Sequence, residues 1–532
     1  MIRTHRFAAV AVVTGVVLSG LAVLPAASAA PERTPEFTPK AIQWGECDNP
    51  RLVQAGAQCG FLEVPLDYAK PNGEKIKLAV SRVKHKGPDS SYQGPMLVNP
   101  GGPGGSGLIY AIFNDFVPDG GGDDYDWIGF DPRGVGSSQP SLSCIPDYDG
   151  YNRPYYTPIT PGIEKTWLQK SKAYAQACGK NGGKLLEHLT TVDSANDMES
   201  IRKALGSEQI NYYGFSYGTY LGQVYGTLFP DRFRRVIFDG NVNPKRVWYD
   251  ANLDQDIAFD KNIKIYFGWI AKYDSIYHLG KTEQQVEALF YKKQAELLRA
   301  PAGGVIGPDE WTDIFLQAGY YVYGWEDVAN AFSGFVHDGD WQTLQELFGT
   351  PPFDDNVHAI YLAVSCTDTQ WPTNWNKWRV DNWITFAKAP FETWGNVWFN
   401  APCVYWPATA DRPVKVDGRK VKNALLINET NDAATPYTGA LEVRKLFPTS
   451  VLIEGVGGTT HSGSLSGVEC TDSLIVDYLK TGALPARKPG NHSDVQCDPV
   501  PQPVPSAASP SARAATASST DARADLAVAV PR

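Results

Sequence analysis

The sequence has little of what marks a nucleic-acid-binding or membrane-embedded protein. Its 532 residues carry 48 Lys and Arg against 58 Asp and Glu, a net charge of −10 that disfavours polyanionic partners. Beyond residue 24, no apolar run approaches the roughly 20 residues that a membrane-spanning helix needs. We therefore expect no nucleic-acid partner and no stable membrane insertion.

Motifs for metal and phosphate binding are also missing. None of the eight cysteines shows the close spacing of a zinc site. The glycine-rich loop at 99–107 lacks the Lys and following Ser or Thr of a phosphate-binding loop. We expect no metal and no cofactor.

The even cysteine count favours disulfides, as in exported proteins. The sequence leaves their connectivity open. Pairing neighbours along the chain would give four modest loops, closed by Cys47–Cys59, Cys144–Cys178, Cys366–Cys403 and Cys470–Cys497.

The N-terminus has the features of an export signal. Two arginines precede the apolar residues 7–24, and residues 27–29 offer a small-residue cleavage pattern. A membrane anchor is the alternative, but the stretch is short for one and a proline follows it directly. We expect a signal peptide at 1–29, a leader or pro-segment at 30–43, and a secreted, extracellular protein.

Strand and helix patterns alternate over residues 44–240 and resume over 413–497, which predicts an α/β fold with a mostly parallel sheet. The intervening residues 241–412 are aromatic and mostly helical in pattern, so we expect a helical cap over the active site. Residues 498–532 are rich in Pro, Ala and Ser and predict a disordered tail. Strands are expected at 61–68, 75–82, 96–99, 127–130, 210–213, 235–239, 424–428 and 450–454, and helices near 195–205, after 217 and at 438–447, the first capped by Ser194.

The sequence Gly214-Phe-Ser-Tyr-Gly218 fits the motif G-x-S-x-G, in which a tight strand-to-helix turn presents a nucleophilic serine. Glycines are needed because side chains would clash in so tight a turn. A strand pattern precedes the motif and a helix pattern follows it. We predict that Ser216 is a nucleophile; a serine in an ordinary glycine turn is the alternative.

A serine hydroxyl needs a base to take its proton, and in enzymes built around this turn the order is Ser, acid, His. His461 lies in a glycine-rich loop after the last predicted strand, where an exposed imidazole is expected; a surface histidine is the alternative. Asp432, shortly after the strand at 424–428, is the best acid, with Glu429 and Asp411 as alternatives.

Acyl transfer also needs two donors for the developing oxyanion. The backbone N–H of Tyr217 should be one, because this residue follows the nucleophile. The glycine-rich loop should supply the other, from Gly101 or Gly102, because glycine lets the backbone approach a substrate closely.

Several motifs, in the same order along the chain, carry a family resemblance. Residues 100–105 resemble the H-G-G-P-G-G loop of prolyl aminopeptidases, and residues 131–138 look like their D-x-R-G-x-G-x-S segment. Residues 214–221 and 432–436 are similar to the exported tripeptidyl aminopeptidases of this α/β-hydrolase group. The resemblance covers residues 44–497. Two positions depart from the family pattern without removing a triad residue, Pro100 for the first histidine and Thr460 for the glycine before the last one.

The resemblance implies an α/β-hydrolase fold and a serine exopeptidase that releases short peptides, tripeptides among them, from free N-termini through an acyl-enzyme. It also implies that cap acids bind the substrate amine. Glu326, Asp327 and Asp368 are candidates from their aromatic surroundings, with ordinary surface or ion-paired acids as the alternative. Asp131 and Arg133 are expected to pair with each other and hold their loop, since triad chemistry does not require them.

Two other functions use the same residues. A carboxylesterase or lipase would need the same triad, because both reactions attack an acyl carbon. A catalytically inactive binding module of the same fold is the third possibility. An epoxide hydrolase or dehalogenase would need an acidic nucleophile, which Ser216 is not.

Overall fold

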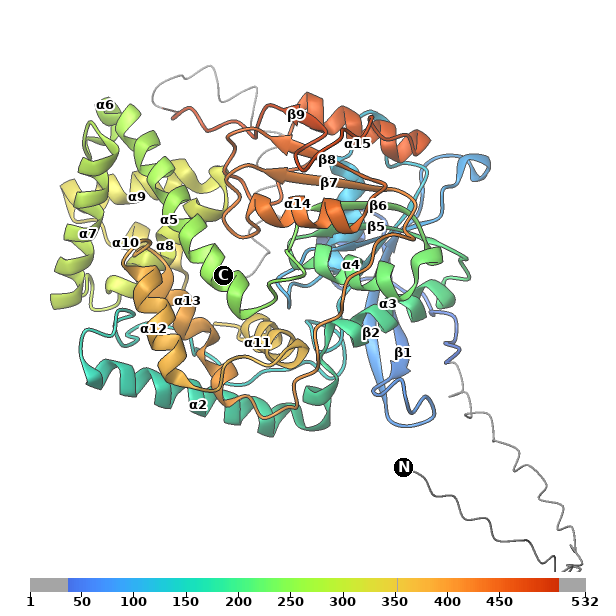
Figure 1. Cartoon of the computed structure of the whole chain (residues 1–532), viewed down its shortest axis with the longest axis horizontal. Helices are drawn as coiled ribbons and strands as arrows, with labels where there is room; N and C mark the ends of the chain where they lie inside the picture. The colour runs from blue at the N-terminus through green and yellow to red at the C-terminus, as the bar shows by residue number, and fades with distance from the viewer. Residues whose placement is uncertain (1–36, 352, 507–532) are drawn as a thin grey trace, which may run out of the picture. The chain divides into compact units, whose positions relative to one another are not determined.

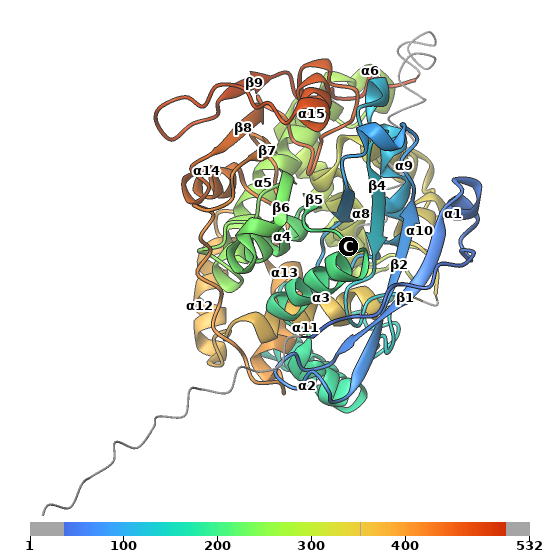
Figure 2. The ribbon, with the colours of Figure 1, turned by 90° about the vertical axis from the view of Figure 1, so that its right-hand side faces the viewer.

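The predicted strands pair into one sheet. In the computed structural model, which describes residues 37–351 and 353–506, nine strands are hydrogen-bonded in the order β1-β2-β4-β3-β5-β6-β7-β8-β9. They are β1 (Gln58–Pro65), β2 (Lys75–Val83), β3 (Pro95–Asn99), β4 (Asp126–Phe130), β5 (Ile210–Phe215), β6 (Phe233–Asp239), β7 (Ala424–Glu429), β8 (Ser450–Gly455) and β9 (Val495–Cys497). β2 pairs antiparallel with β1 and β4, and the other pairs are parallel (Figure 2). This confirms the mostly parallel sheet and its N-terminal hairpin.

Helices cover both faces of the sheet, as parallel strands require. Outside the long insertion they are α1 (Pro50–Gln54), α2 (Pro161–Gly182), α3 (Thr191–Ala204), α4 (Tyr217–Leu228), α14 (Tyr437–Leu446), α15 (Glu469–Thr481) and the 3-10 helix η2 (Leu108–Phe116). Leu97 and Tyr212 pack in the cluster that contains α3 and α4 side chains. Their neighbours Val98 and Tyr213 point to the opposite face, toward η2 and α15.

A helical insertion separates β6 from β7, which are neighbours in the sheet. Its helices are α5 (Tyr249–Lys272), α6 (Asp274–Tyr277), α7 (Glu283–Arg299), α8 (Pro308–Tyr320), α9 (Trp325–Asp338), α10 (Gln342–Phe348), α11 (Asn356–Asp368), α12 (Trp375–Phe386) and α13 (Thr393–Asn400). Figure 1 shows them gathered beside the sheet as a cap, and many of them share an aromatic core that includes Phe290, Trp311 and Trp325.

Helix α2 adds a wall to this cap, although it precedes β5 in the sequence. Trp167 of α2 stacks on Trp398 of α13, with ring centroids 5.5 Å apart and planes 6° apart. Just before α2, Arg153 forms an ion pair with Asp313 of α8 at 2.6 Å. The sequence pattern did not indicate this helix, and it brings residues 153–182 to the active-site side of the molecule.

The four disulfides join neighbouring cysteines along the chain. Cys366–Cys403 ties the end of α11 to the segment after α13, so it closes one side of the cap. Cys470–Cys497 ties α15 to β9 at the edge of the sheet. Within the described ranges no helix is both long and apolar enough to cross a bilayer.

Two local expectations are wrong. Helix α3 begins at Thr191, and the Thr190 side chain caps it by accepting a hydrogen bond from the Asp193 N–H, so Ser194 lies inside the helix. The chain is also ordered beyond residue 498, because residues 498–506 pack against the cap. The predicted signal peptide at 1–29, half of the leader at 30–43 and the tail from 507 lie outside the described residues.

Asp131 and Arg133 do not pair with each other. Arg133 instead forms a bidentate ion pair with Asp197 of α3, both bonds being 2.7 Å long, and is 1% exposed. Asp131 accepts hydrogen bonds from Ser106 and from the backbone N–H groups of 107 and 137. Each residue therefore holds a loop, as expected, but with a partner that lies far away in the sequence.

Replacing Arg133 by Met should leave the Asp197 carboxylate buried without its counter-charge. We expect a loss of about 3–5 kcal/mol in the free energy of unfolding, measured by urea denaturation. Arg419→Met is the matched control, because Arg419 pairs with Asp417 in solvent. Equal losses of unfolding free energy in the two variants would show that the buried ion pair stabilises the fold no more than the exposed one.

Candidate active site

The serine lies in a strained turn between β5 and α4. Ser216 has φ 54° and ψ −125°, a conformation that non-glycine residues rarely adopt. A Cβ on Gly214 would lie 2.6 Å from the Gly218 carbonyl oxygen, and one on Gly218 would lie 2.6 Å from the Asn99 carbonyl oxygen. The two glycines of the motif are therefore required by close packing, and the turn has the geometry of a nucleophile elbow.

The structure brings His461 to Asp432. His461 Nδ1 lies 2.9 Å from both carboxylate oxygens of Asp432. Thr435 donates to the same carboxylate through its N–H and its hydroxyl. Of the alternative acids, Glu429 accepts backbone N–H groups and Asp411 is exposed, so Asp432 alone holds the imidazole. This arrangement leaves Nε2 of the ring as the atom that could accept a proton.

One backbone carbonyl joins the serine turn to the histidine loop. The Asp239 carbonyl, at the end of β6, accepts the Ser216 N–H at 2.9 Å and the Ser462 hydroxyl at 3.2 Å. That hydroxyl lies 3.5 Å from His461 Nε2. The Asp239 carbonyl therefore holds the Ser216 turn and the His461 loop side by side at the carboxyl ends of β5 and β6.

The imidazole is buried, not exposed as the sequence led us to expect. His461 is 2% exposed, and the rings of Tyr320 and Tyr321 lie over it. Its backbone N–H donates to the Tyr320 carbonyl at 2.8 Å. Asn262 of α5 donates to the carbonyl of Thr459 in the same loop. The cap therefore covers and orders the histidine loop, which no local sequence pattern could indicate.

The predicted oxyanion donors lie beside the serine. Gly101 has φ +99°, and a Cβ on it would lie 2.9 Å from the Ser216 Cβ and 3.0 Å from the Tyr217 nitrogen. The Gly101 N–H already donates to the Asn99 side chain. Gly102 lines the cavity described below, and its N–H has no partner in the described part of the chain. Of the two glycines, Gly102 is the better placed donor.

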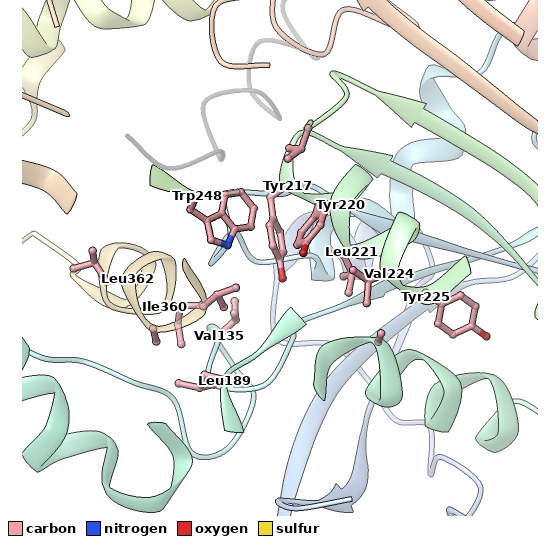
Figure 3. Packing of buried hydrophobic residues seen from close by; sticks show 14 of the residues in the cluster. Val135, Leu189, Tyr217, Tyr220, Leu221, Val224, Tyr225, Trp248, Ile360 and Leu362 are labelled. Carbon is pink, nitrogen blue, oxygen red and sulfur yellow. The ribbon is translucent and has the colours of Figure 1, made fainter. Parts of the chain in front are cut away.

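Tyr217 is held from behind by a hydrogen-bonded chain. Its ring packs against Trp248 and Tyr220 (Figure 3). Its hydroxyl lies 2.8 Å from the Thr191 hydroxyl, which donates to Asp368 at 2.6 Å. Asp368 also accepts the Thr191 N–H at the start of α3. This carboxylate therefore supports the residue whose N–H is the predicted oxyanion donor.

A cavity of 770 Å³ extends from the serine into the cap. Gly102 and Ser216 lie at one end, and aromatic side chains of the cap, including Tyr320, Tyr361 and Trp398, form much of the wall. Among the described residues that line the cavity, six are acids and one is an arginine, Arg153. The lining acids are Asp149, Asp313, Asp327, Glu346, Asp354 and Glu392.

The three acids proposed for the substrate amine have different places. Asp327 lines the cavity, but Glu326 and Asp368 are not among the described residues that line it. Glu326 accepts the backbone N–H of Ser506, and Asp368 lies behind Tyr217. The sequence criterion, an acid among aromatics, does not distinguish an acid that faces a cavity from one that holds a backbone segment.

The most unusual acid of the cavity is Glu392, which the sequence did not indicate. It is buried, and its Oε2 has no hydrogen-bond partner in the described ranges. Burial raises the pKa of Glu392 well above its usual value; Asp313 and Asp256 raise it further, while Arg153 lowers it. Such a group can receive a cation. The described residues contain no group of His, Cys, Asp or Glu side chains that could hold a metal ion.

Asp368→Asn tests the role of the carboxylate behind Tyr217. Burial raises the pKa of Asp368 to about 7, from an ordinary value of 3.8, although the bonds from Thr191 lower it. The folded state thus binds the proton more tightly, so this contribution to stability is complete below about pH 4 and disappears as the pH rises through 7. Wild type should lose roughly 3 kcal/mol more than Asp368→Asn between pH 5 and 8, measured by urea unfolding. If the unfolding free energies of wild type and Asp368→Asn changed in parallel with pH, that result would contradict the raised pKa of Asp368.

Several known proteins are similar in sequence to this chain over most of its length. Residues 94–282 match the family model for the α/β hydrolase fold, and residues 389–497 match the model for TAP-like proteins. A tripeptidyl aminopeptidase of Streptomyces coelicolor is 40% identical over 486 residues, which cover 87% of each chain. Serine protease Hip1 of Mycobacterium tuberculosis is 28% identical, covering 84% of this chain and 89% of that one. Carboxylesterase B of the same organism is also 28% identical, covering 81% and 85%.

Proposed function

The chain belongs to the tripeptidyl aminopeptidase group of the α/β-hydrolase family, and we propose that it is a secreted serine exopeptidase that releases short peptides, chiefly tripeptides, from free N-termini. The observation that carries this proposal is the His461–Asp432 pair beside the strained Ser216, at one end of an acid-rich cavity under the cap. The Streptomyces relative, at 40% identity, supports the same activity.

The proposed chemistry is acyl transfer. His461 Nε2 takes the proton of the Ser216 hydroxyl as its oxygen attacks the scissile carbonyl, and Asp432 stabilises the imidazolium that forms. The N–H groups of Tyr217 and Gly102 receive the oxyanion. The imidazolium then gives its proton to the leaving amine, and a water molecule, activated by the same histidine, hydrolyses the acyl-enzyme.

The acidic part of the cavity explains the requirement for a free N-terminus. A peptide whose scissile carbonyl lies at Ser216 extends its N-terminal residues into the cap. We propose that Glu392, with its unpaired oxygen, receives the substrate ammonium, and that Asp313 and Asp327 add negative potential there. The ammonium would supply the counter-charge that the buried carboxyl lacks, and binding would then favour its ionised form.

A carboxylesterase is the second candidate, because one relative carries that name. An ester has no ammonium group, and the buried unpaired carboxyl of Glu392 would have no use in binding it. The acidity of the cavity therefore favours the peptide. Secretion is proposed from the N-terminal signal and agrees with the four disulfides, which persist in oxidising compartments.

The first experiment compares chromogenic peptides of one, two and three residues, with free or acetylated N-termini, and a short-chain ester. We expect turnover of free-amine peptides, fastest for the tripeptide, to exceed that of acetylated peptides and of the ester by about a hundredfold, and to fall by at least about a thousandfold in Ser216→Ala. Ester turnover without peptide cleavage would move the protein to the esterases. No turnover, together with no labelling of Ser216 by a fluorophosphonate, would leave a binding module.

Glu392→Gln tests the amine site. The substitution keeps the shape and removes the charge, so kcat/KM for a free-amine tripeptide should fall about a hundredfold, while turnover of an acetylated peptide or ester should change little. Glu346→Gln is the matched control, because Glu346 lines the same cavity but is exposed. An equal loss on free and acetylated substrates would contradict an amine contact.

A further inference from the structure

The last described residues, 498–506, form an extended segment that we call the strap. Figure 1 shows it running from β9 toward the cap helices. Every second residue of the strap is a proline: Pro499, Pro501, Pro503 and Pro505. Such a sequence favours a stiff, extended backbone that retains an N–H only at alternate positions.

The strap bridges the sheet and the cap through those alternate positions. The Val500 N–H donates to Oε1 of Glu429 at 2.6 Å, and the Ser506 N–H donates to Oε1 of Glu326 on α9 at 2.8 Å. Between them, the Pro503 carbonyl accepts the indole N–H of Trp269 on α5 at 2.9 Å. The Val500 side chain is 3% exposed within the aromatic core of the cap.

Glu429 holds the histidine loop with its other oxygen. Its Oε2 accepts the N–H of Thr460, the residue before His461, at 2.5 Å. The loop is wrapped closely around this carboxyl, since a Cβ on Gly458 would lie 2.4 Å from the Glu429 Cδ and one on Gly455 would lie 3.0 Å from its Cγ. The carboxyl therefore accepts one backbone N–H from the catalytic loop and one from the strap.

The proposed mechanism gives Glu429 no role, because Asp432 holds the imidazole. Keeping a carboxyl in this place is unfavourable: burial, the largest cause, together with Asp432 and Asp239 raises the pKa of Glu429 to about 8, although the two backbone bonds lower it. A buried acid under such conditions is retained where its two acceptor oxygens meet donors that an apolar side chain could not satisfy.

We propose that Glu429 is a positioning residue for His461, and that the strap contributes to this position by sharing the same carboxyl group. The proposal rests on His461 acting as the base of the proposed function, but not on the choice of substrate. It also gives Glu326 a structural role, as the anchor of the strap on the cap.

Glu429→Gln tests the proposal in the full-length protein. Its amide can accept only through its single oxygen, so one of the two N–H donors loses its acceptor. We expect kcat for the tripeptide substrate and the rate of fluorophosphonate labelling of Ser216 both to fall about tenfold, with KM changed less than about twofold. Glu454→Gln is the matched control, a buried glutamate of the neighbouring strand β8 whose partners include Thr430, Tyr437 and Ser493 rather than the histidine loop.

Val500→Pro tests the strap without changing Glu429. Proline lacks the N–H that Val500 donates, and Gln502→Pro is the matched control in the same segment, because the Gln502 N–H has no partner among the described residues. We expect Val500→Pro to slow labelling about threefold to tenfold and Gln502→Pro to have no effect. Combined with Glu429→Gln, Val500→Pro should add little, because both act on one contact.

The outcomes separate position from stability. Slower labelling in Glu429→Gln and Val500→Pro, but not in the two controls, at a temperature where all variants are folded, supports the proposal. Equal labelling rates in all four, or melting temperatures that fall without a change in kcat, would show that Glu429 and the strap are only structural. If Glu429→Gln does not fold, an unchanged rate in Val500→Pro overturns the role of the strap. Wild-type protein that labels but does not cleave peptides would count against the proposed substrate alone.

Discussion

The hydrogen bond between His461 and Asp432 is the contact around which the active site is built. The two residues come from loops after β8 and β7, and neither loop could hold its side chain alone. Thr435 fixes the carboxylate, while the Tyr320 carbonyl and the Asn262 amide hold the histidine loop from the cap. The sheet supplies the direction of each loop, and the cap supplies the burial that makes the charge interactions strong.

Burial under the cap has a consequence for every carboxyl in this region. The pKa values of Glu392, Glu429 and Asp368 are all raised, with burial as the largest cause in each. Their partners distinguish them. Asp368 and Glu429 accept backbone N–H groups and hold segments in place, whereas Glu392 keeps an oxygen without a partner and faces the cavity. The same physical condition thus produces two structural acids and one acid suited to a ligand.

The cap is attached to the sheet at several separate places. Asn262 bridges α5 to the loops of the acid and the histidine, and the strap crosses from β9 to α9. The cavity of 770 Å³ lies under a cap that is held in this way.

The sequence by itself determined the features that depend on neighbouring residues. The strand-to-helix turn at Ser216 requires glycines two residues away on each side, and the order of strands and helices follows from local hydrophobic patterns, so both could be predicted. Asp432 and His461 could also be proposed from the sequence, since each follows a recognisable strand. The sequence left the connectivity of the cysteines open, and in the structure they pair with their nearest neighbours along the chain.

Only the tertiary structure decided the rest, because those features join residues that lie far apart in the chain. Arg133 finds Asp197 rather than Asp131, and the cap buries an imidazole whose own loop predicts exposure. Glu392 carries no motif, and the missing partner of its Oε2 depends on how distant segments of the described chain pack around it. The strap looks like a disordered tail in its composition, yet a proline-rich segment needs little further ordering to bind a surface that presents acceptors at the right places.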